Sequence, residues 1–361
     1  MSTLSTYLED PVLSKLYTQV REAGAVKSIS VDLTHECNLR CKGCYYFEEG
    51  MDKIVDTSAN LDAAFKQFLD SEKERGTNFI TIVGGEPSLQ LDRLKMVYDN
   101  FKMNVATNGL IRIPYEGFEQ MPIGVAVWGS NETDAELRNK GKRDLFSIAL
   151  DNYKNDSRAF FYYTVSPDKS EEIASVVEKC IQNGNKVLFN YFSDIHNKKD
   201  IAGYRAGFEN VRVEIEKAIQ KYPEHVLTTS YFNQVITTGQ LYDQHWGYDV
   251  CTNVSTNFEP NQGRLKNGNP YNPHFRSYNA DFKTTRRCCT GIDRSCDSCC
   301  DAWEHFSWIL INMKKHMGTK QEFINWLTSM YMFYYINRII TEEEVVLTQV
   351  HSLLNSGIIA D

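Results

Sequence analysis

Apolar and polar positions alternate in six short stretches of the first half of the chain, and segments of helical periodicity lie between them. Alternation over about four to eight residues predicts a strand, whereas apolar residues three or four apart predict a helix. The predicted strands span residues 27–33, 78–83, 103–106, 123–128, 159–165 and 186–192, and the predicted helices span 60–75, 89–100, 144–153 and 171–183. This rhythm predicts an α/β fold with βαβ units and a parallel sheet, curved into a partial (β/α)6 TIM-like barrel.

The pattern changes on both sides of this core. Residues 1–26 have apolar positions at helical spacing and predict a helical lead-in to a core barrel at 27–200. Beyond it, residues 208–220, 231–239, 301–315 and 320–339 predict helices, while the Asn-, Gly- and Pro-rich segment 253–285 predicts an irregular loop. Residues 201–361 are therefore expected to form a Cys-rich, mainly helical C-terminal extension.

Composition narrows the class of protein. The 361 residues are 42% hydrophobic and 24% charged, which is ordinary for a globular chain. No apolar run approaches the ~18 residues of a membrane span, and the N-terminus lacks the pattern of a signal peptide, so we expect a cytoplasmic protein with no membrane partner. The net charge is -8 and no basic strip is present, which argues against nucleic acid as a partner.

The ten cysteines are clustered: three lie in residues 37–44 and five in residues 288–300. In a reducing compartment such clusters favour metal over disulfides. Cys37, Cys41 and Cys44 follow the first predicted strand, and three thiolates can hold three irons of a cubane while the fourth iron accepts a non-protein ligand. The alternative is a zinc site with His35 as a fourth ligand.

This loop, with Tyr45 directly after the third cysteine, resembles the signature of the radical S-adenosylmethionine (radical SAM) superfamily. The resemblance implies a [4Fe–4S] cluster on Cys37, Cys41 and Cys44, with S-adenosylmethionine bound at the open iron. Reductive cleavage would then give a 5′-deoxyadenosyl radical that abstracts hydrogen from a substrate. The cofactor would supply the difficult chemistry, and the protein would position and shield it.

Later strand ends carry further motifs of this resemblance. Gly84-Gly85-Glu86-Pro87 resembles the G-G-E-P turn that receives the methionine amino group, with glycines that turn sharply and a carboxylate that accepts from an ammonium. The remaining S-adenosylmethionine contacts that the resemblance implies are Thr107, Asn108, Ser130 near the ribose, Arg138 near the methionine carboxylate, and Asn190 or Tyr163 near adenosine or substrate. The alternatives are ordinary turns for the glycine motif and for Thr107 and Asn108, and a solvated charge on a helix for Arg138.

The second cysteine cluster resembles the auxiliary cluster sites of family members with twitch or SPASM extensions, although its spacing departs from the SPASM pattern. We expect one auxiliary [4Fe–4S] cluster. Zinc is one alternative, and free thiols, of which one could give a hydrogen atom to a substrate radical, are the other. The expected ligands are Cys251, Cys289, Cys296 and Cys299, with Cys288 and Cys300 as alternates.

The motifs identify no catalytic residue and no substrate. An oxidoreductase or another radical enzyme is expected, carrying out oxidation, epimerisation or carbon–carbon bond formation. A small molecule is favoured as the substrate, with flavodoxin or ferredoxin as the electron donor. The alternatives are a peptide-modifying radical SAM maturase and a non-catalytic iron–sulfur or zinc protein that acts as a sensor or interaction module.

Overall fold

The computed structural model describes residues 3–55, 61–194, 200–292, 295–340, 350 and 352–353. Its main sheet has eight strands in the order β10-β9-β1-β2-β3-β4-β5-β6, and neighbours from β1 to β6 run parallel. The six core strands are β1 (Ser28–Asp32), β2 (Phe79–Val83), β3 (Lys102–Thr107), β4 (Ile123–Val127), β5 (Ala159–Val165) and β6 (Lys186–Tyr191). The predicted α/β fold with a six-stranded parallel barrel core is confirmed.

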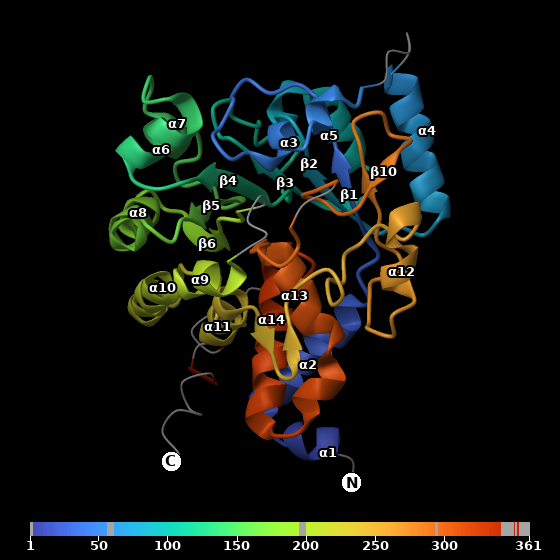
Figure 1. Cartoon of the computed structure of the whole chain (residues 1–361), viewed down its shortest axis with the longest axis vertical. Helices are drawn as coiled ribbons and strands as arrows, with labels where there is room; N and C mark the ends of the chain where they lie inside the picture. The colour runs from blue at the N-terminus through green and yellow to red at the C-terminus, as the bar shows by residue number, and fades with distance from the viewer. Residues whose placement is uncertain are drawn as a thin grey trace.

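Helices cover the outer face of this curved sheet (Figure 1). They are α3 (Tyr45–Glu48), α4 (Leu61–Glu74), α5 (Leu91–Tyr98), α6 (Asn131–Asn139), α7 (Leu145–Asn152) and α8 (Ile173–Gln182), with 3-10 turns at Met51–Lys53, Pro87–Leu89 and Ser170–Glu172. Each longer helix buries an apolar stripe; α8 buries Ile173, Val176, Val177 and Cys180 at helical spacing. Asn60, where one helix was predicted to begin, lies outside the described residues.

The extension contains more regular structure than its sequence pattern predicts. Its elements are α9 (Ile201–Ala206), α10 (Glu209–Lys221), α11 (Ser230–Thr238), β7 (Gln240–Leu241), β8 (Gln244–His245), α12 (Gln262–Leu265), β9 (Ser277–Tyr278), β10 (Thr285–Arg286), α13 (Ala302–Ile311) and α14 (Lys320–Ile336), with 3-10 turns at Glu259–Asn261 and Met313–Met317. The prediction of a wholly irregular segment 253–285 is wrong, because β9 pairs in parallel with β1 and β10 pairs with β9. Strands of two residues are too short to show a period.

The N-terminal lead-in packs against the end of the extension. It forms α1 (Thr3–Tyr7) and α2 (Pro11–Ala23), which lie beside α14 in Figure 1. The Tyr334 hydroxyl donates to the Gly24 carbonyl at 2.6 Å, and Lys320 pairs with Asp10 at 3.0 Å. Segments at opposite ends of the chain therefore form one helical layer below the sheet.

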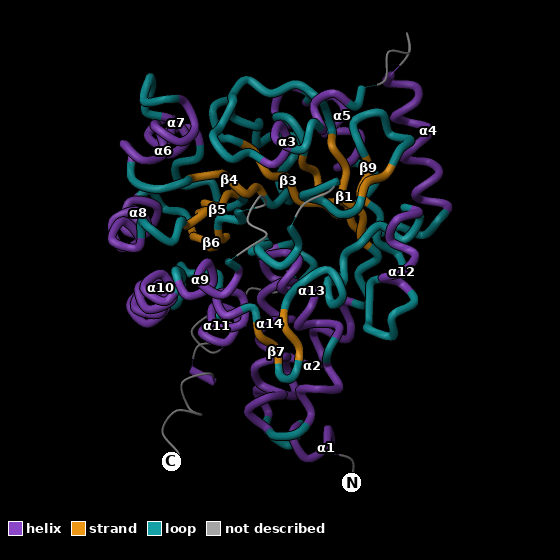
Figure 2. The backbone as a smooth tube through the Cα atoms, viewed as in Figure 1, coloured by secondary structure: helices purple, strands orange, loops and turns teal. Residues whose placement is uncertain are grey.

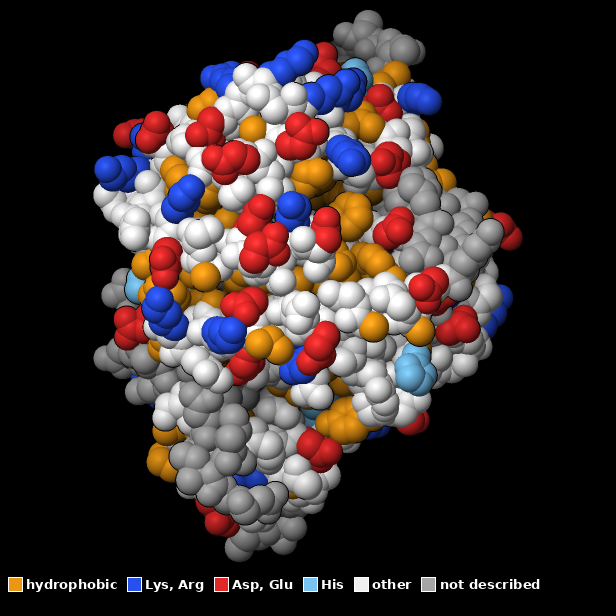
Figure 3. Space-filling view, turned by 60° about the vertical axis from the view of Figure 1, so that its left-hand side comes forward, with side chains coloured by type: hydrophobic (Ala, Val, Ile, Leu, Met, Phe, Trp, Pro, Cys, Tyr) orange, Lys and Arg blue, Asp and Glu red, His pale blue; other side chains and the backbone are white. Residues whose placement is uncertain are grey.

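Two features bear on possible partners: the distribution of charged side chains on the surface, and the length of the helices. Acidic and basic side chains are interspersed on the face shown in Figure 3, with apolar side chains between them. Among the described helices, none combines the length and the apolar character that crossing a bilayer requires.

Candidate functional site

The inner face of the curved sheet lines a cavity of about 510 Å³, and side chains of α13 and α14 also line it. Figure 2 shows these two helices below the strands. Alternate residues of the core strands point into it, and most of them are small or polar. These inward residues include Ser28, Ser30, Thr81, Asn104, Ala106, Gly124, Ala126, Phe160, Tyr162, Thr164 and Asn190. The sequence signal was a small or polar residue at every second position of otherwise apolar strands, which leaves room inside the barrel.

The first cysteine loop opens onto this cavity. Cys37, Cys41 and Cys44 lie between β1 and α3; Cys44 precedes the first turn of α3, and its backbone N–H donates to the Cys41 carbonyl at 3.3 Å. The Leu39 N–H points at the Cys37 sulfur at 3.4 Å. Burial raises the pKa of Cys37 to about 11 and that of Cys44 to about 12, and the neighbouring thiols add to the shift. Bound iron would deprotonate all three.

The spacing of these sulfurs distinguishes a cluster from a single ion. Among the described residues, only Cys289, Asp301 and Glu304 bring three possible ligand atoms within 4.8 Å of one another. The three loop sulfurs, with or without His35, therefore form no such tight group. A tetrahedral zinc ion with bonds of about 2.3 Å would hold its sulfurs about 3.8 Å apart. The arrangement of the loop in this structure is therefore not that of a single closed zinc site.

The turn after β2 packs against the cysteine loop as only glycines permit. Gly84 and Gly85 have φ of 75° and 48°, in the left-handed region. A Cβ on Gly85 would lie 2.1 Å from the carbonyl oxygen of Glu36, and one on Gly84 would lie 2.3 Å from the Cβ of Asp32. The Glu86 N–H also donates to the Glu36 carbonyl at 2.7 Å. The turn thus fixes the residues immediately before Cys37.

The Glu86 carboxylate ties neighbouring strand ends together. It is 1% exposed and accepts from the Ser88 N–H at 2.9 Å, the Thr107 hydroxyl at 2.6 Å and the Asn108 N–H at 2.7 Å. Pro87 begins the 3-10 turn that follows. The structure thus places Glu86, Thr107 and Asn108 together, while the contact of Glu86 with a methionine ammonium stays a prediction.

Arg138 lies next to the cysteine loop, beside Cys41. Its side chain is 1% exposed and donates to the carbonyls of Ala126 and Asn108, each at 2.8 Å, and to Asp134 at 3.1 Å. Burial lowers the pKa of Arg138, but the Asp134 carboxylate and the adjacent Cys41 thiol outweigh burial and raise it. Arg138 does not line the cavity. Its predicted contact with the methionine carboxylate is untested by this arrangement and stays a prediction.

The other predicted contacts are divided between cavity and protein interior. Tyr45 and Asn190 line the cavity, and the Asn190 side-chain oxygen accepts from the Ala302 N–H at 3.0 Å. Ser130 caps α6 by accepting from the Thr133 N–H at 3.4 Å. Tyr163 is 1% exposed in the core and packs against Phe189. On β5 the residue that faces the cavity is Tyr162, because neighbouring side chains of a strand point to opposite faces.

The second cysteine group is assembled from separated segments. Burial, the Glu304 carboxylate and the thiols of Cys288, Cys296 and Cys299 all raise the pKa of Cys251, and the Cys251 thiol lies 3.8 Å from Glu304 Oε2. That Cys251, Cys296 and Cys299, with the alternate Cys288, hold one cluster stays a prediction.

The other two cysteines of this group make contacts of their own. The Cys289 thiol donates to Glu304 Oε1 at 2.8 Å, on the carboxylate that the Cys251 thiol also contacts, and it lines the barrel cavity with Asp301. Burial, with the Glu304 and Asp301 carboxylates, raises the pKa of Cys289. Cys300 is fully buried, and its sulfur accepts from Arg205 Nη1 at 3.0 Å. The sequence had grouped Cys289 with the cluster ligands.

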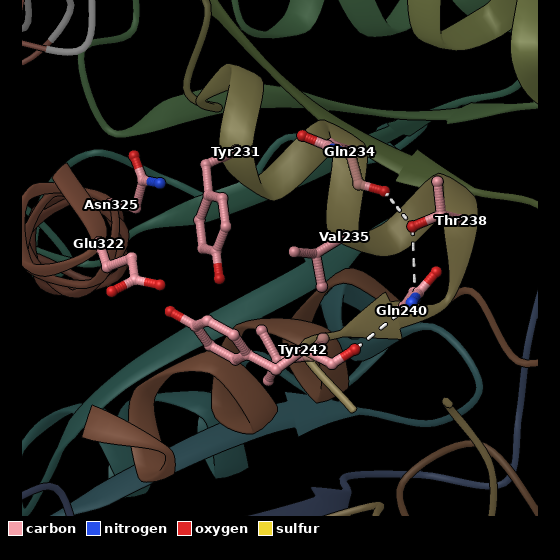
Figure 4. Close-up of a pocket in the computed structure, with 9 residues that line it drawn as sticks. Tyr231, Gln234, Val235, Thr238, Gln240, Tyr242, Glu322 and Asn325 are labelled. Atoms are coloured by element: carbon pink, nitrogen blue, oxygen red, sulfur yellow. Dashed lines mark hydrogen bonds between the residues drawn. The ribbon is translucent and has the colours of Figure 1, made fainter. Parts of the chain in front are cut away.

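A second cavity, of about 360 Å³, lies between α11, β7 and α14 (Figure 4). Tyr231, Tyr242 and Glu322 point toward one another across it, and Tyr231 Oη lies 2.7 Å from His316 Nε2. None of the predicted site residues lines this cavity. Of the cysteines, Cys44 and Cys289 line the barrel cavity instead.

Residues 24–120 match the family model of a 4Fe-4S single cluster domain. The match spans the cysteine loop, the glycine turn and the strands β1 to β3 that position them. The match favours the iron–sulfur interpretation of the loop over the zinc interpretation. Because it covers less than half of the chain, membership of the radical SAM superfamily stays a prediction, and so do the [4Fe–4S] cluster and S-adenosylmethionine as cofactors.

Comparisons over the whole chain give only distant similarities. No curated protein matches it. Among solved structures, Streptococcus suis SuiB bound to S-adenosylmethionine is similar with a TM-score of 0.38 and 15% identity over 59% of this chain and 53% of SuiB. The chain thus spans about half the length of SuiB.

Two further solved structures are similar over more of the chain. Native anSMEcpe with bound AdoMet and Cp18Cys peptide has a TM-score of 0.46 and 16% identity over 82% of this chain and 83% of the other. The FeFe-hydrogenase maturase HydG from Carboxydothermus hydrogenoformans has a TM-score of 0.39 and 12% identity, over 94% and 90%.

Proposed function

We propose that this protein cleaves S-adenosylmethionine reductively and uses the resulting radical to abstract hydrogen from a substrate held in the barrel cavity. The observation that carries the proposal is that Cys44 and Tyr45 line the same cavity as the inward residues of the six core strands. The cluster and S-adenosylmethionine supply the radical chemistry when bound at Cys37, Cys41 and Cys44.

The residues of the chain supply position and shielding. The Tyr46 hydroxyl donates to the Thr34 carbonyl at 3.1 Å, which holds α3 against the start of the cysteine loop. Aromatic side chains from the strands and covering helices, among them Phe160, Trp303 and Phe333, line the cavity. An apolar, enclosed lining excludes water, which protects a reactive intermediate from side reactions.

A small molecule is the proposed substrate. A cavity of about 510 Å³ lies within the range of roughly 300–1,000 Å³ typical of small-molecule sites. Oxidation, epimerisation and carbon–carbon bond formation are all compatible with such a site. The proposal includes a cytoplasmic location, an external donor such as flavodoxin or ferredoxin, and an auxiliary [4Fe–4S] cluster at Cys251, Cys289, Cys296 and Cys299, with Cys288 and Cys300 as alternates. Modification of a peptide side chain is the competing outcome of a substrate search.

The test uses protein reconstituted with iron and sulfide under anaerobic conditions. With dithionite and S-adenosylmethionine, we expect 5′-deoxyadenosine, and we expect Cys41→Ala to abolish it because one corner of the cluster loses its ligand. Cys180→Ala is the matched control, since that thiol is buried on α8 away from the cavity, and it should keep the activity. Colourless protein that binds zinc and forms no 5′-deoxyadenosine would contradict the proposal.

A further inference from the structure

The cavity between α11, β7 and α14 has no part in the proposed function (Figure 4). Its volume of about 360 Å³ falls within the roughly 300–1,000 Å³ typical of small-molecule sites. Among the described residues that line it, Glu322 is the only charged one, and Tyr231 and Tyr242 are the only aromatic ones. The oxygens of these three side chains point toward one another across the cavity.

A buried histidine fixes the hydroxyl of Tyr231. His316 is fully buried, and its Nδ1 lies 2.8 Å from the Asn312 carbonyl oxygen. A carbonyl only accepts, so Nδ1 carries the ring hydrogen, while burial lowers the pKa of His316 and leaves Nε2 without one. The Tyr231 hydroxyl, 2.7 Å from Nε2, therefore donates to the ring. Its oxygen presents only lone pairs to the cavity.

Tyr242 is held in an unusual backbone conformation. It follows β7 in the turn to β8 with φ of 54°, in the left-handed region, where a bulky side chain is strained and Gly, Asn or Asp is usual. Its ring packs edge-on against His316, with 5.1 Å between the ring centroids. The turn thus places a second phenol oxygen at the cavity, and a hydroxyl can accept as well as donate.

The Glu322 carboxylate completes the group of oxygens. Its Oε2 accepts from the Thr319 N–H at 2.8 Å, as part of the capping box of α14. Within the described part of the chain, Glu322 forms no ion pair, and Oε1 has no hydrogen-bond partner. One carboxylate oxygen and two phenol oxygens thus converge on a space that no described cation neutralises.

We propose that this cavity binds a small molecule that carries a primary ammonium group. An ammonium has three N–H donors and no acceptor, which matches the three oxygens of Glu322, Tyr231 and Tyr242. The carboxylate supplies the opposite charge, and the tyrosine rings attract a cation placed over their faces. Val235 and Leu241, which also line the cavity, receive the alkyl part of the ligand. This site goes beyond the proposed function and does not depend on it.

The experiment titrates the full-length protein with butylammonium chloride in a calorimeter at low ionic strength, where an ion pair is least screened. We expect saturable binding. Butan-1-ol has a similar shape without the charge, and butyrate carries the opposite charge, so neither should bind. Tetramethylammonium has the charge but no N–H donor, and it should bind about tenfold more weakly or worse.

Variants assign the binding to this cavity. Glu322→Gln keeps the size of the side chain, and glutamine completes a capping box as glutamate does, so the helix should be retained. Its affinity for butylammonium should fall about tenfold or more, because the charged acceptor is lost. Tyr231→Phe and Tyr242→Phe each remove one acceptor and should lower the affinity by a smaller factor. The exposed Glu74→Gln is the matched control and should bind as the wild type does.

Three results would overturn the proposal: no saturable binding of butylammonium by the wild type, equal affinity in the wild type and Glu322→Gln, or binding of butan-1-ol or tetramethylammonium as tight as that of butylammonium. Circular dichroism checks that each variant is folded. If Glu322→Gln were not, Tyr231→Phe and Tyr242→Phe would decide, and unchanged affinity in both would refute the site. Formation of 5′-deoxyadenosine is measured separately, so failure of either proposal leaves the other standing.

Discussion

The two cysteine regions of this protein show how differently a sequence can encode a group of thiols. The first takes three thiols from eight consecutive residues, in one loop that the strand β1 and the helix α3 hold in place. The second gathers thiols from residue 251 and residues 288–300. Spacing along the chain indicates the ligands when one loop supplies them all. It does not when separate segments converge, because neighbouring cysteines can then face different spaces.

A buried ion pair joins the two regions. Asp32 at the end of β1 accepts from both terminal nitrogens of Arg286 on β10, at 2.7 and 2.8 Å, and both side chains are 1% exposed. Arg286 also donates to the Cys289 carbonyl at 3.1 Å, while Gly84 packs against Asp32. Burial lowers the pKa of Arg286, but the Asp32 carboxylate outweighs burial and raises it. Burial also raises the pKa of Asp32, against the opposing effect of the Arg286 guanidinium.

The largest effect is expected from breaking this pair. Asp32→Asn leaves a buried guanidinium without its counter-charge, which should lower the free energy of unfolding by about 3–5 kcal/mol. Urea denaturation measures the loss, and iron analysis should show less iron at both cysteine regions. Asp99→Asn is the control, because its pair with Lys95 is exposed and worth less than about 1 kcal/mol. Loss of iron from one region alone would show that the two fold independently.

A smaller effect, confined to the first region, is expected from Gly85→Ala. The added Cβ would lie 2.1 Å from the Glu36 carbonyl oxygen, on a backbone with φ of 48°, so the turn must shift. This shift should lower the free energy of unfolding by about 2–4 kcal/mol. The first cluster should lose iron while the second keeps it. Gly263→Ala, which has nothing within 4 Å of the added atom, should leave both unchanged. Equal losses in the two variants would refute the packing argument.

The smallest effect is expected from Glu86→Gln. The amide keeps the size of the side chain but turns an NH₂ group toward one of the three donors from which Glu86 accepts. That buried donor loses its acceptor, and an unsatisfied buried donor costs about 1–3 kcal/mol of free energy. Calorimetry should show weaker binding of S-adenosylmethionine by reconstituted protein, with iron content unchanged. The exposed Glu74→Gln is the control. Unchanged binding in Glu86→Gln would restrict Glu86 to a structural role of no consequence for the cofactor.

Particular residues show how far sequence reasoning reached inside the barrel. The strands and the glycine turn could be predicted from the local pattern, because period-two alternation and a Gly-Gly pair are each typical of few structures. The sequence could not show whether Tyr162 or Tyr163 faces the cavity, since the register of the strand decides which of two adjacent side chains points inward. The predicted contact of Arg138 with the methionine carboxylate stays a prediction, whereas its hydrogen bonds to the Ala126 and Asn108 carbonyls and to Asp134 became visible only in the fold.

By itself, the sequence determined the parallel core, the cluster loop and the glycine turn beside it, because each depends on residues close together in the chain. Only the tertiary structure decided that β9 and β10 extend the sheet, that Arg286 reaches Asp32, and that Cys289 enters the cavity while Cys288 does not. These features depend on contacts between segments more than two hundred residues apart or on the direction of a single side chain. Local periodicity carries no information about either.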